Sequence, residues 1–225
     1  MIMNINTKEL RIMRKIIIKK LINKPKKVEQ TFSNLLYSLL ENKTVMKRFA
    51  KAVLKLNRFD ENNYSIIKQK NKIDLFIKSS NHYFVIENKI CSNLIKENKR
   101  IDRTLKKYFK KDKDMLNEFL DKFKTKDYYY HTDKYFAYAS SNANEQALVT
   151  GYVLFPNYAI ENIAMALNDT IFKKHFSLIT CFQVFDFFNK IKTENWLNEK
   201  EKIYLDEFLK AMEKHTRENE HAICT

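Results

Sequence analysis

The sequence predicts an α/β protein, and three observations lead to that fold class. Apolar residues recur at helical spacing over residues 28–40, and further helices are predicted toward the C-terminal end. Between these helices the chain holds short runs rich in Ile, Val and aromatic residues, which are typical of strands. Two of the runs are separated only by Ser79, Ser80 and Asn81, so we expect them to form a hairpin.

The composition indicates one domain with local extensions. The 225 residues are 44% hydrophobic and 13% aromatic, which is enough for one substantial core. We expect a basic N-terminal helix or arm over residues 1–27, the main domain over 28–216 and a frayed tail over 217–225. No apolar run approaches the roughly 18 residues of a membrane span, so we expect no stable membrane association. Cys91, Cys181 and Cys224 lie far apart and outside any CxxC pattern, which favours a reducing, cytoplasmic interior over a zinc or disulfide framework.

The net charge of +15 is concentrated in two segments. Residues 1–27 contain nine Lys or Arg against Glu9, and residues 96–111 contain eight against Glu97 and Asp102. A clustered basic surface suits a polyphosphate partner, because each neutralised phosphate releases condensed counterions. The competing interpretation is that lysine codons are simply abundant in an AT-rich genome.

The helices before residue 60 are predicted from spacing and caps. Residues 7–23 have helical spacing within a basic segment that Pro25 ends, and they suit a core-packing helix first, then a nucleic-acid arm or a membrane-surface helix. In the next helix Glu29 lies in line with the apolar residues and edges their stripe. Its apolar stripe consists of Val28, Phe32, Leu35, Leu36, Leu39 and Leu40. A further helix is predicted with Thr44 as its cap and with Val45, Phe49, Val53 and Leu56 buried.

The later elements are predicted from shorter patterns. Strands are expected at residues 64–69, 73–78, 82–87, 134–140 and 176–180, and helices at 101–109, 114–123, 158–167 and 199–215. Residues 146–155 are apolar and remain ambiguous between strand and helix.

The predicted hairpin brings together residues that suit phosphodiester chemistry. Asp74 starts one strand and Glu87 ends the next, so a tight turn places them side by side. Residues two apart on a strand share a face, so Glu87 and Lys89 project together while Asn88 points away. Carboxylates are hard oxygen ligands for Mg²⁺, which polarises a phosphodiester and lowers the pKa of water. The lysine would orient that water or neutralise charge in the transition state.

The tripeptide Glu-Asn-Lys occurs three times, at residues 41–43, 87–89 and 97–99, so the tripeptide alone carries little information. Only the middle copy follows an apolar strand, at residues 83–86, and has an acid on the strand before it. The alternative interpretation of this copy is a simple ion pair at the edge of a sheet.

Residues 72–77 read Lys-Ile-Asp-Leu-Phe-Ile, and residues 84–90 read Phe-Val-Ile-Glu-Asn-Lys-Ile. These segments resemble the PD-(D/E)xK nuclease superfamily, in the branch with an "iDilI…IENKI…QLxxY" signature. The resemblance extends to a glutamate on an upstream helix, matched by Glu29, and to a downstream helix in which Thr104 takes the place of the Gln and Tyr108 that of the Tyr. It implies a restriction-endonuclease-like fold, with a mixed, mainly four-stranded sheet flanked by helices.

The resemblance also implies roles for individual residues. Asp74 and Glu87 would bind Mg²⁺ or Mn²⁺, the backbone carbonyl of Asn88 would add a ligand, and Lys89 would act on the water or the transition state. Glu29 would be a fourth acid, although a carboxylate that only edges its helix fits the same pattern. A basic face would lie near the phosphate backbone, unless it is an ordinary solvated face. This face comprises Lys99, Arg100, Arg103, Thr104, Lys106 and Lys107.

The expected function is therefore metal-dependent hydrolysis of nucleic acid, with DNA favoured over RNA. Two alternatives remain open: a nuclease-like fold without catalysis that binds nucleic acid or protein, which Thr104 in place of Gln favours, and a membrane-surface or scaffold protein that uses the basic N-terminal helix. A homodimer is plausible, because cutting two strands with one site per chain often needs a dimer. No HExxH pattern occurs among the five histidines, and the single glycine, Gly151, excludes a Walker loop.

Overall fold

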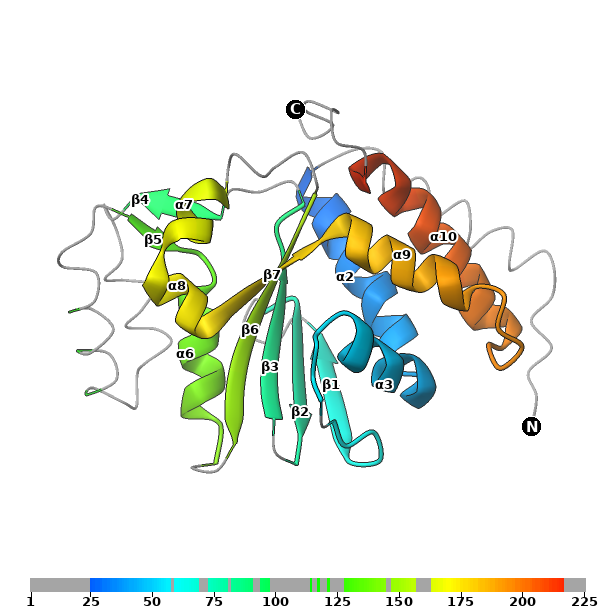
Figure 1. Ribbon diagram of the computed structural model, residues 1–225, viewed down its shortest axis with the longest axis horizontal. Coiled ribbons are helices and arrows are strands. Elements are labelled where there is room, and N and C mark those ends of the chain that lie inside the picture. Colours follow the sequence, from blue (N-terminus) through cyan, green and yellow to red (C-terminus); the bar gives the residue numbers. More distant parts are fainter. Residues whose placement is uncertain are drawn as a thin grey trace.

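A five-stranded mixed sheet lies between two layers of helices in the computed structural model (Figure 1). The structure describes residues 25–57, 59–68, 73–80, 82–90, 94–97, 114, 117, 121, 128–144, 147–156 and 163–216. The strands follow the order β1 (Tyr64–Lys68), β2 (Leu75–Ser79), β3 (His82–Asn88), β6 (Leu148–Phe155) and β7 (Phe176–Thr180). The first three strands are antiparallel, whereas β3, β6 and β7 run parallel. The predicted mixed α/β architecture is confirmed, with five strands rather than four because β7 pairs alongside β6.

Helices cover both faces of the sheet. One face is packed against α2 (Pro25–Leu40), α3 (Lys43–Ala52), α9 (Cys181–Ile191) and α10 (Glu199–Thr216). The other face is packed against α6 (Asp133–Ser141), α7 (Ala164–Asn168) and α8 (Thr170–His175). A separate two-stranded sheet joins β4 (Ile95–Glu97) to β5 (Tyr128–Tyr130). No helix of the described part of the chain is long and apolar enough to cross a membrane.

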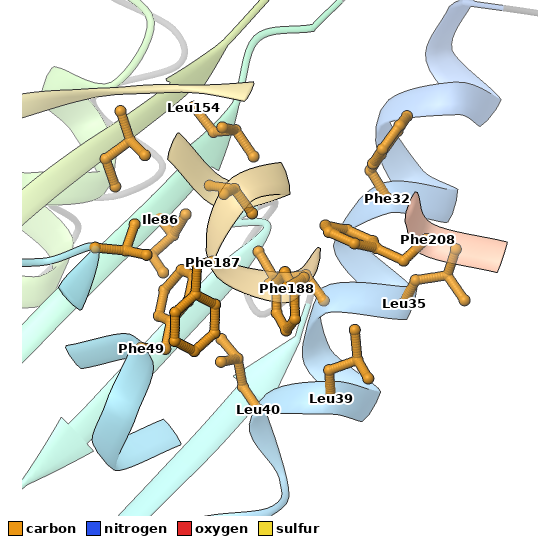
Figure 2. Packing of buried hydrophobic residues seen from close by; sticks show 14 of the residues in the cluster. Phe32, Leu35, Leu39, Leu40, Phe49, Ile86, Leu154, Phe187, Phe188 and Phe208 are labelled. Carbon is orange, nitrogen blue, oxygen red and sulfur yellow. The ribbon is translucent and has the colours of Figure 1, made fainter. Parts of the chain in front are cut away.

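Alternation along the strands sorts the side chains between the two layers. Leu75 and Ile86 point into the large core between the sheet and α2, α3, α9 and α10, whereas Phe76 and Val85 point toward α6. Figure 2 shows the aromatic centre of the large core, where Phe188 of α9 lies 4.9 Å from Phe208 of α10 between ring centroids. The direction in which each strand residue points therefore follows from its parity in the sequence.

Helix α2 confirms the apolar stripe predicted for residues 28–40, whose six members are all buried. The helix begins at Pro25, which is tolerated in a first turn because its missing N–H would have no helical partner there. The predicted boundary between residues 27 and 28 thus falls inside α2. The helix expected over residues 7–23 lies outside the described residues.

Three predictions of local structure are wrong. The cap of α3 is Asn42 rather than Thr44, because the Asn42 Oδ1 accepts hydrogen bonds from the backbone N–H of both Thr44 and Val45. Leu56, predicted as buried, is only partly buried because α3 ends at Ala52. Residues 134–140 form helix α6 instead of a strand, since alanine favours helix and the i, i+4 pair Tyr135 and Ala139 packs on the sheet.

The remaining elements follow the predictions where the structure describes them. The ambiguous segment 146–155 becomes strand β6, and the strand at 176–180 and the helix at 199–215 are confirmed. Of the helix predicted over 158–167, residues 163–167 are described, and all but Ile163 belong to α7. The helix at 101–109, most of 114–123 and the tail at 217–225 lie outside the described residues.

Candidate active site

The hairpin of β2 and β3 sets Asp74 beside Glu87. At the end of the β2–β3 ladder Leu75 pairs with Ile86, so the next residues along the two strands are Asp74 and Glu87. The Oδ2 atom of Asp74 accepts a hydrogen bond of 2.8 Å from the backbone N–H of Asn88. This bond fixes the Asp74 carboxylate against the end of β3, and both acids lie at the end of the hairpin opposite its turn.

Neighbouring residues at the end of β3 point to opposite layers, as the sequence predicts. The Nζ atom of Lys89 donates to Oε1 of Glu87 at 2.5 Å, and their side chains are only 9% and 5% exposed. The Nδ2 atom of Asn88 instead donates to Oγ of Ser33 on α2 at 2.5 Å. Ser33 in turn donates to the backbone carbonyl of Glu29 at 2.9 Å. A chain of hydrogen bonds therefore connects Asp74 through Asn88 to the turn of α2 that carries Glu29.

Burial sets the proton affinities of the two acids. Burial, reinforced by the charge of Glu87, raises the pKa of Asp74 well above its ordinary value, although the Asn88 N–H and Lys89 oppose that shift. Burial also raises the pKa of Glu87, against the opposing effects of Lys89, a hydrogen bond from the Asp74 backbone and the charge of Lys134. The described cations therefore do not fully compensate the negative charge that the two acids carry when ionised. This favours binding of a further cation.

The lysine keeps its charge in this environment. Burial acts to lower the pKa of Lys89, but the neighbouring charges of Glu87, Glu29 and Asp74 outweigh it and raise that pKa. Lys89 is therefore a protonated ammonium at neutral pH. An ammonium carries three N–H donors, and one of them is directed at Glu87.

The donor atoms suit a hard divalent cation. Within the described residues, Oε2 of Glu87 and Oδ1 of Asn88 are buried and have no hydrogen-bond partner. Buried polar atoms are almost always satisfied, so an unpaired carboxylate oxygen beside a second carboxylate fits an oxygen-binding ion such as Mg²⁺. Asp74 and Glu87 would hold such an ion. No group of three or more His, Cys, Asp or Glu side chains placed to hold a metal occurs in the described part of the chain.

Glu29 lies near this pair without completing a three-acid cluster among the described residues. It is half-buried on α2, and its charge acts on both Asp74 and Lys89. Its role as a metal ligand stays a prediction. The predicted nucleic-acid-binding face, which consists of Lys99, Arg100, Arg103, Thr104, Lys106 and Lys107, lies outside the described residues.

One further charged residue belongs to the site, although no motif singles it out in the sequence. Lys134, in the first turn of α6, is only 9% exposed and its charge acts on Glu87. It falls in the segment that the sequence predicts as a strand. A signal that could have identified it is its spacing to Tyr138, which equals the spacing between Thr104 and Tyr108 in the proposed resemblance.

No protein-family model, no curated protein and no solved structure matches the chain. The functional interpretation therefore depends on the residues of this chain and on the geometry of the site around Asp74 and Glu87.

Proposed function

We propose that the chain is a divalent-metal-dependent nuclease of the PD-(D/E)xK type with a restriction-endonuclease-like fold. Its substrate would be a nucleic acid phosphodiester, with DNA favoured over RNA. The observation that carries the proposal is the cluster of partly buried Asp74 with the buried side chains of Glu87 and Lys89 at the end of one hairpin, in which one oxygen of Glu87 has no hydrogen-bond partner among the described residues.

Each residue of the cluster would have a separate role. Asp74 and Glu87 would hold Mg²⁺ or Mn²⁺, and the backbone carbonyl of Asn88 is available as an additional ligand. When bound, the cation supplies polarisation of the phosphodiester and a lower pKa for attacking water. Lys89, anchored on Oε1 of Glu87, retains N–H donors that can orient that water or stabilise charge developing on the phosphate.

A purely structural ion pair explains the site less well. Removing charges from water costs several kcal/mol per ion, which a single buried pair offsets only with good geometry and further hydrogen bonds. Here a second, partly buried carboxylate, Asp74, adds to the negative charge beside the pair, and one oxygen of Glu87 has no partner within the described chain. Strongly perturbed carboxylates next to a buried lysine are more typical of functional sites than of structural ones.

The test is a cleavage assay with matched variants. Wild type is incubated with single-stranded DNA, double-stranded DNA and RNA, in Mg²⁺, Mn²⁺ or EDTA, alongside Asp74→Ala, Lys89→Ala and Lys43→Ala. Lys43 is the control, because it is the exposed lysine of another Glu-Asn-Lys tripeptide. We expect cutting that requires metal, that Asp74→Ala and Lys89→Ala abolish and that Lys43→Ala preserves.

The opposite result has a clear meaning. If wild type binds these nucleic acids but cuts none of them, and the two site variants bind equally well, then the nuclease proposal fails. The chain would then be better described as a nuclease-like fold that serves as a nucleic-acid-binding module.

A further inference from the structure

We propose that Lys134 is a second cationic residue of the site and binds a phosphate group of the nucleic acid substrate. This inference depends on the proposed nuclease function and adds to it a residue that comes from a different element. Asp74, Glu87 and Lys89 all belong to the hairpin or its end, whereas Lys134 lies on α6, after β5.

The packing of α6 brings Lys134 to the correct face of the sheet. Tyr135 and Ala139 of α6 form one buried cluster with Ile73, Phe76 and Val85. By strand alternation, the face that carries Phe76 and Val85 also carries Asp74 and Glu87. Because Lys134 directly precedes Tyr135, the first turn of α6 lies over the end of the hairpin where the two acids stand.

Lys134 is a buried residue next to the carboxylates of the candidate site. The residue is 9% exposed, and its Nζ atom lies 4.7 Å from the centroid of the Tyr135 ring. Lysines are almost never buried unless a negative partner or a function requires it. Its charge acts on Glu87, yet Oε2 of Glu87 has no hydrogen-bond partner among the described residues, so Lys134 does not donate to that oxygen.

The net charge of the site indicates what Lys134, its second cationic side chain, contributes. Among the described residues whose charges act on one another here, Glu29, Asp74 and Glu87 carry three negative charges when ionised, against the two positive charges of Lys89 and Lys134. One divalent cation would make the loaded site positive by one charge, which matches one phosphodiester. Without Lys134 the loaded site would be neutral and would attract a phosphate less strongly, so Lys134 is the charge that makes the site favour an anion.

A structural role for Lys134 predicts different behaviour. A lysine that only compensates Glu87 affects the stability of the fold and the metal site, but it releases no counterion when nucleic acid binds. A lysine that binds phosphate contributes to the salt dependence of binding. Each phosphate that a protein neutralises adds about 0.9 to the log–log slope on duplex DNA and about 0.7 on a single strand.

The experiment measures that slope with Ca²⁺ in place of Mg²⁺, on whichever substrate wild type cleaves. The variants are Lys134→Met, Lys134→Gln, Lys134→Arg and the control Lys200→Met. Lys200 also lies over a tyrosine ring, at 5.6 Å, but it is exposed at the start of α10. We expect the Met and Gln variants to have a slope shallower by about one neutralised phosphate and to raise KM more than they lower kcat. We expect Lys134→Arg and Lys200→Met to keep the wild-type slope.

Three results overturn the inference. If the Met or Gln variant, whichever folds, keeps the wild-type slope and KM on a substrate that wild type cleaves, then Lys134 is structural and the nuclease proposal stands. If the Arg variant has a slope as shallow as the uncharged variants, then charge at this position is not what matters. A wild type that neither binds nor cleaves any nucleic acid refutes the nuclease proposal itself and the Lys134 inference with it.

Discussion

Replacing Lys89 with Met tests whether the lysine is the main counter-charge of Glu87. The two side chains form an ion pair of 2.5 Å and are 9% and 5% exposed, so solvent screens the pair weakly. The methionine keeps most of the volume and removes only the charge and its hydrogen bond. Glu87 would then be a buried carboxylate without its closest cation.

The magnitude follows from the burial of the pair. Removing one partner of a buried ion pair costs about 3–5 kcal/mol, because the other charge remains desolvated. The backbone hydrogen bond from Asp74 and the charge of Lys134 still favour ionised Glu87, which places the expected loss near the lower end, about 3 kcal/mol. In a protein of this size such a loss lowers Tm by roughly 6–12 °C.

The assay is urea unfolding at neutral pH of wild type, Lys89→Met, and Lys89→Met combined with Glu87→Gln. The double variant has a neutral amide in place of the carboxylate, so it should recover most of the lost stability. The deficit of Lys89→Met should also shrink as the pH falls and Glu87 takes up a proton. A loss below about 1 kcal/mol, as in an exposed pair, or a double variant as unstable as the single one, would refute this reasoning.

Three further outcomes are expected. Because burial raises the pKa of Asp74, the folded state binds that proton more tightly and loses stability as the pH rises above the ordinary value of 3.8; in urea titrations the stability of Asp74→Asn relative to wild type should therefore increase as the pH is raised above that value. Thermal melts should show Mg²⁺ stabilising wild type, by about 2.7 kcal/mol at roughly a hundred times Kd, but not Glu87→Gln. Gly151→Ala should cost about 1–3 kcal/mol in a urea titration, because the new methyl would overlap the Phe176 ring, which stacks on Phe172.

The parts of the fold that the sequence predicts are those governed by local periodicity. Strand alternation and a short turn are enough to place Asp74 beside Glu87 and to turn Asn88 away from Lys89; β2 runs through Ser79, so the turn is one residue shorter than the sequence predicts. The apolar stripe of α2 is equally local, since it needs only the 3.6-residue period. Each of these relations involves residues close together in the chain, so no knowledge of the tertiary fold is required.

The parts that the sequence does not predict depend on distant contacts. Tyr135, Ala137 and Ala139 alternate as in a strand, and only their packing in α6 shows that the period is helical. Lys134 and Glu87 are far apart in the chain, so nothing local indicates that they share a site. The fifth strand also depends on distant contacts. Strands β6 and β7 pair in parallel, so a crossover must connect them, and the residues near β7 do not indicate which strand of the sheet it will pair with.

The double hydrogen bonding of Asn88 has a practical consequence for spectroscopy. Its backbone amide proton is directed at the Asp74 carboxylate, and its side-chain amide protons include one directed at Ser33 of α2. In a nitrogen-labelled sample, one residue therefore gives two kinds of resonance, one sensitive to the ionisation of Asp74 and the other to the distance between helix and sheet. Following both signals during a titration would separate a change in charge from a movement of the helix, without any attached probe.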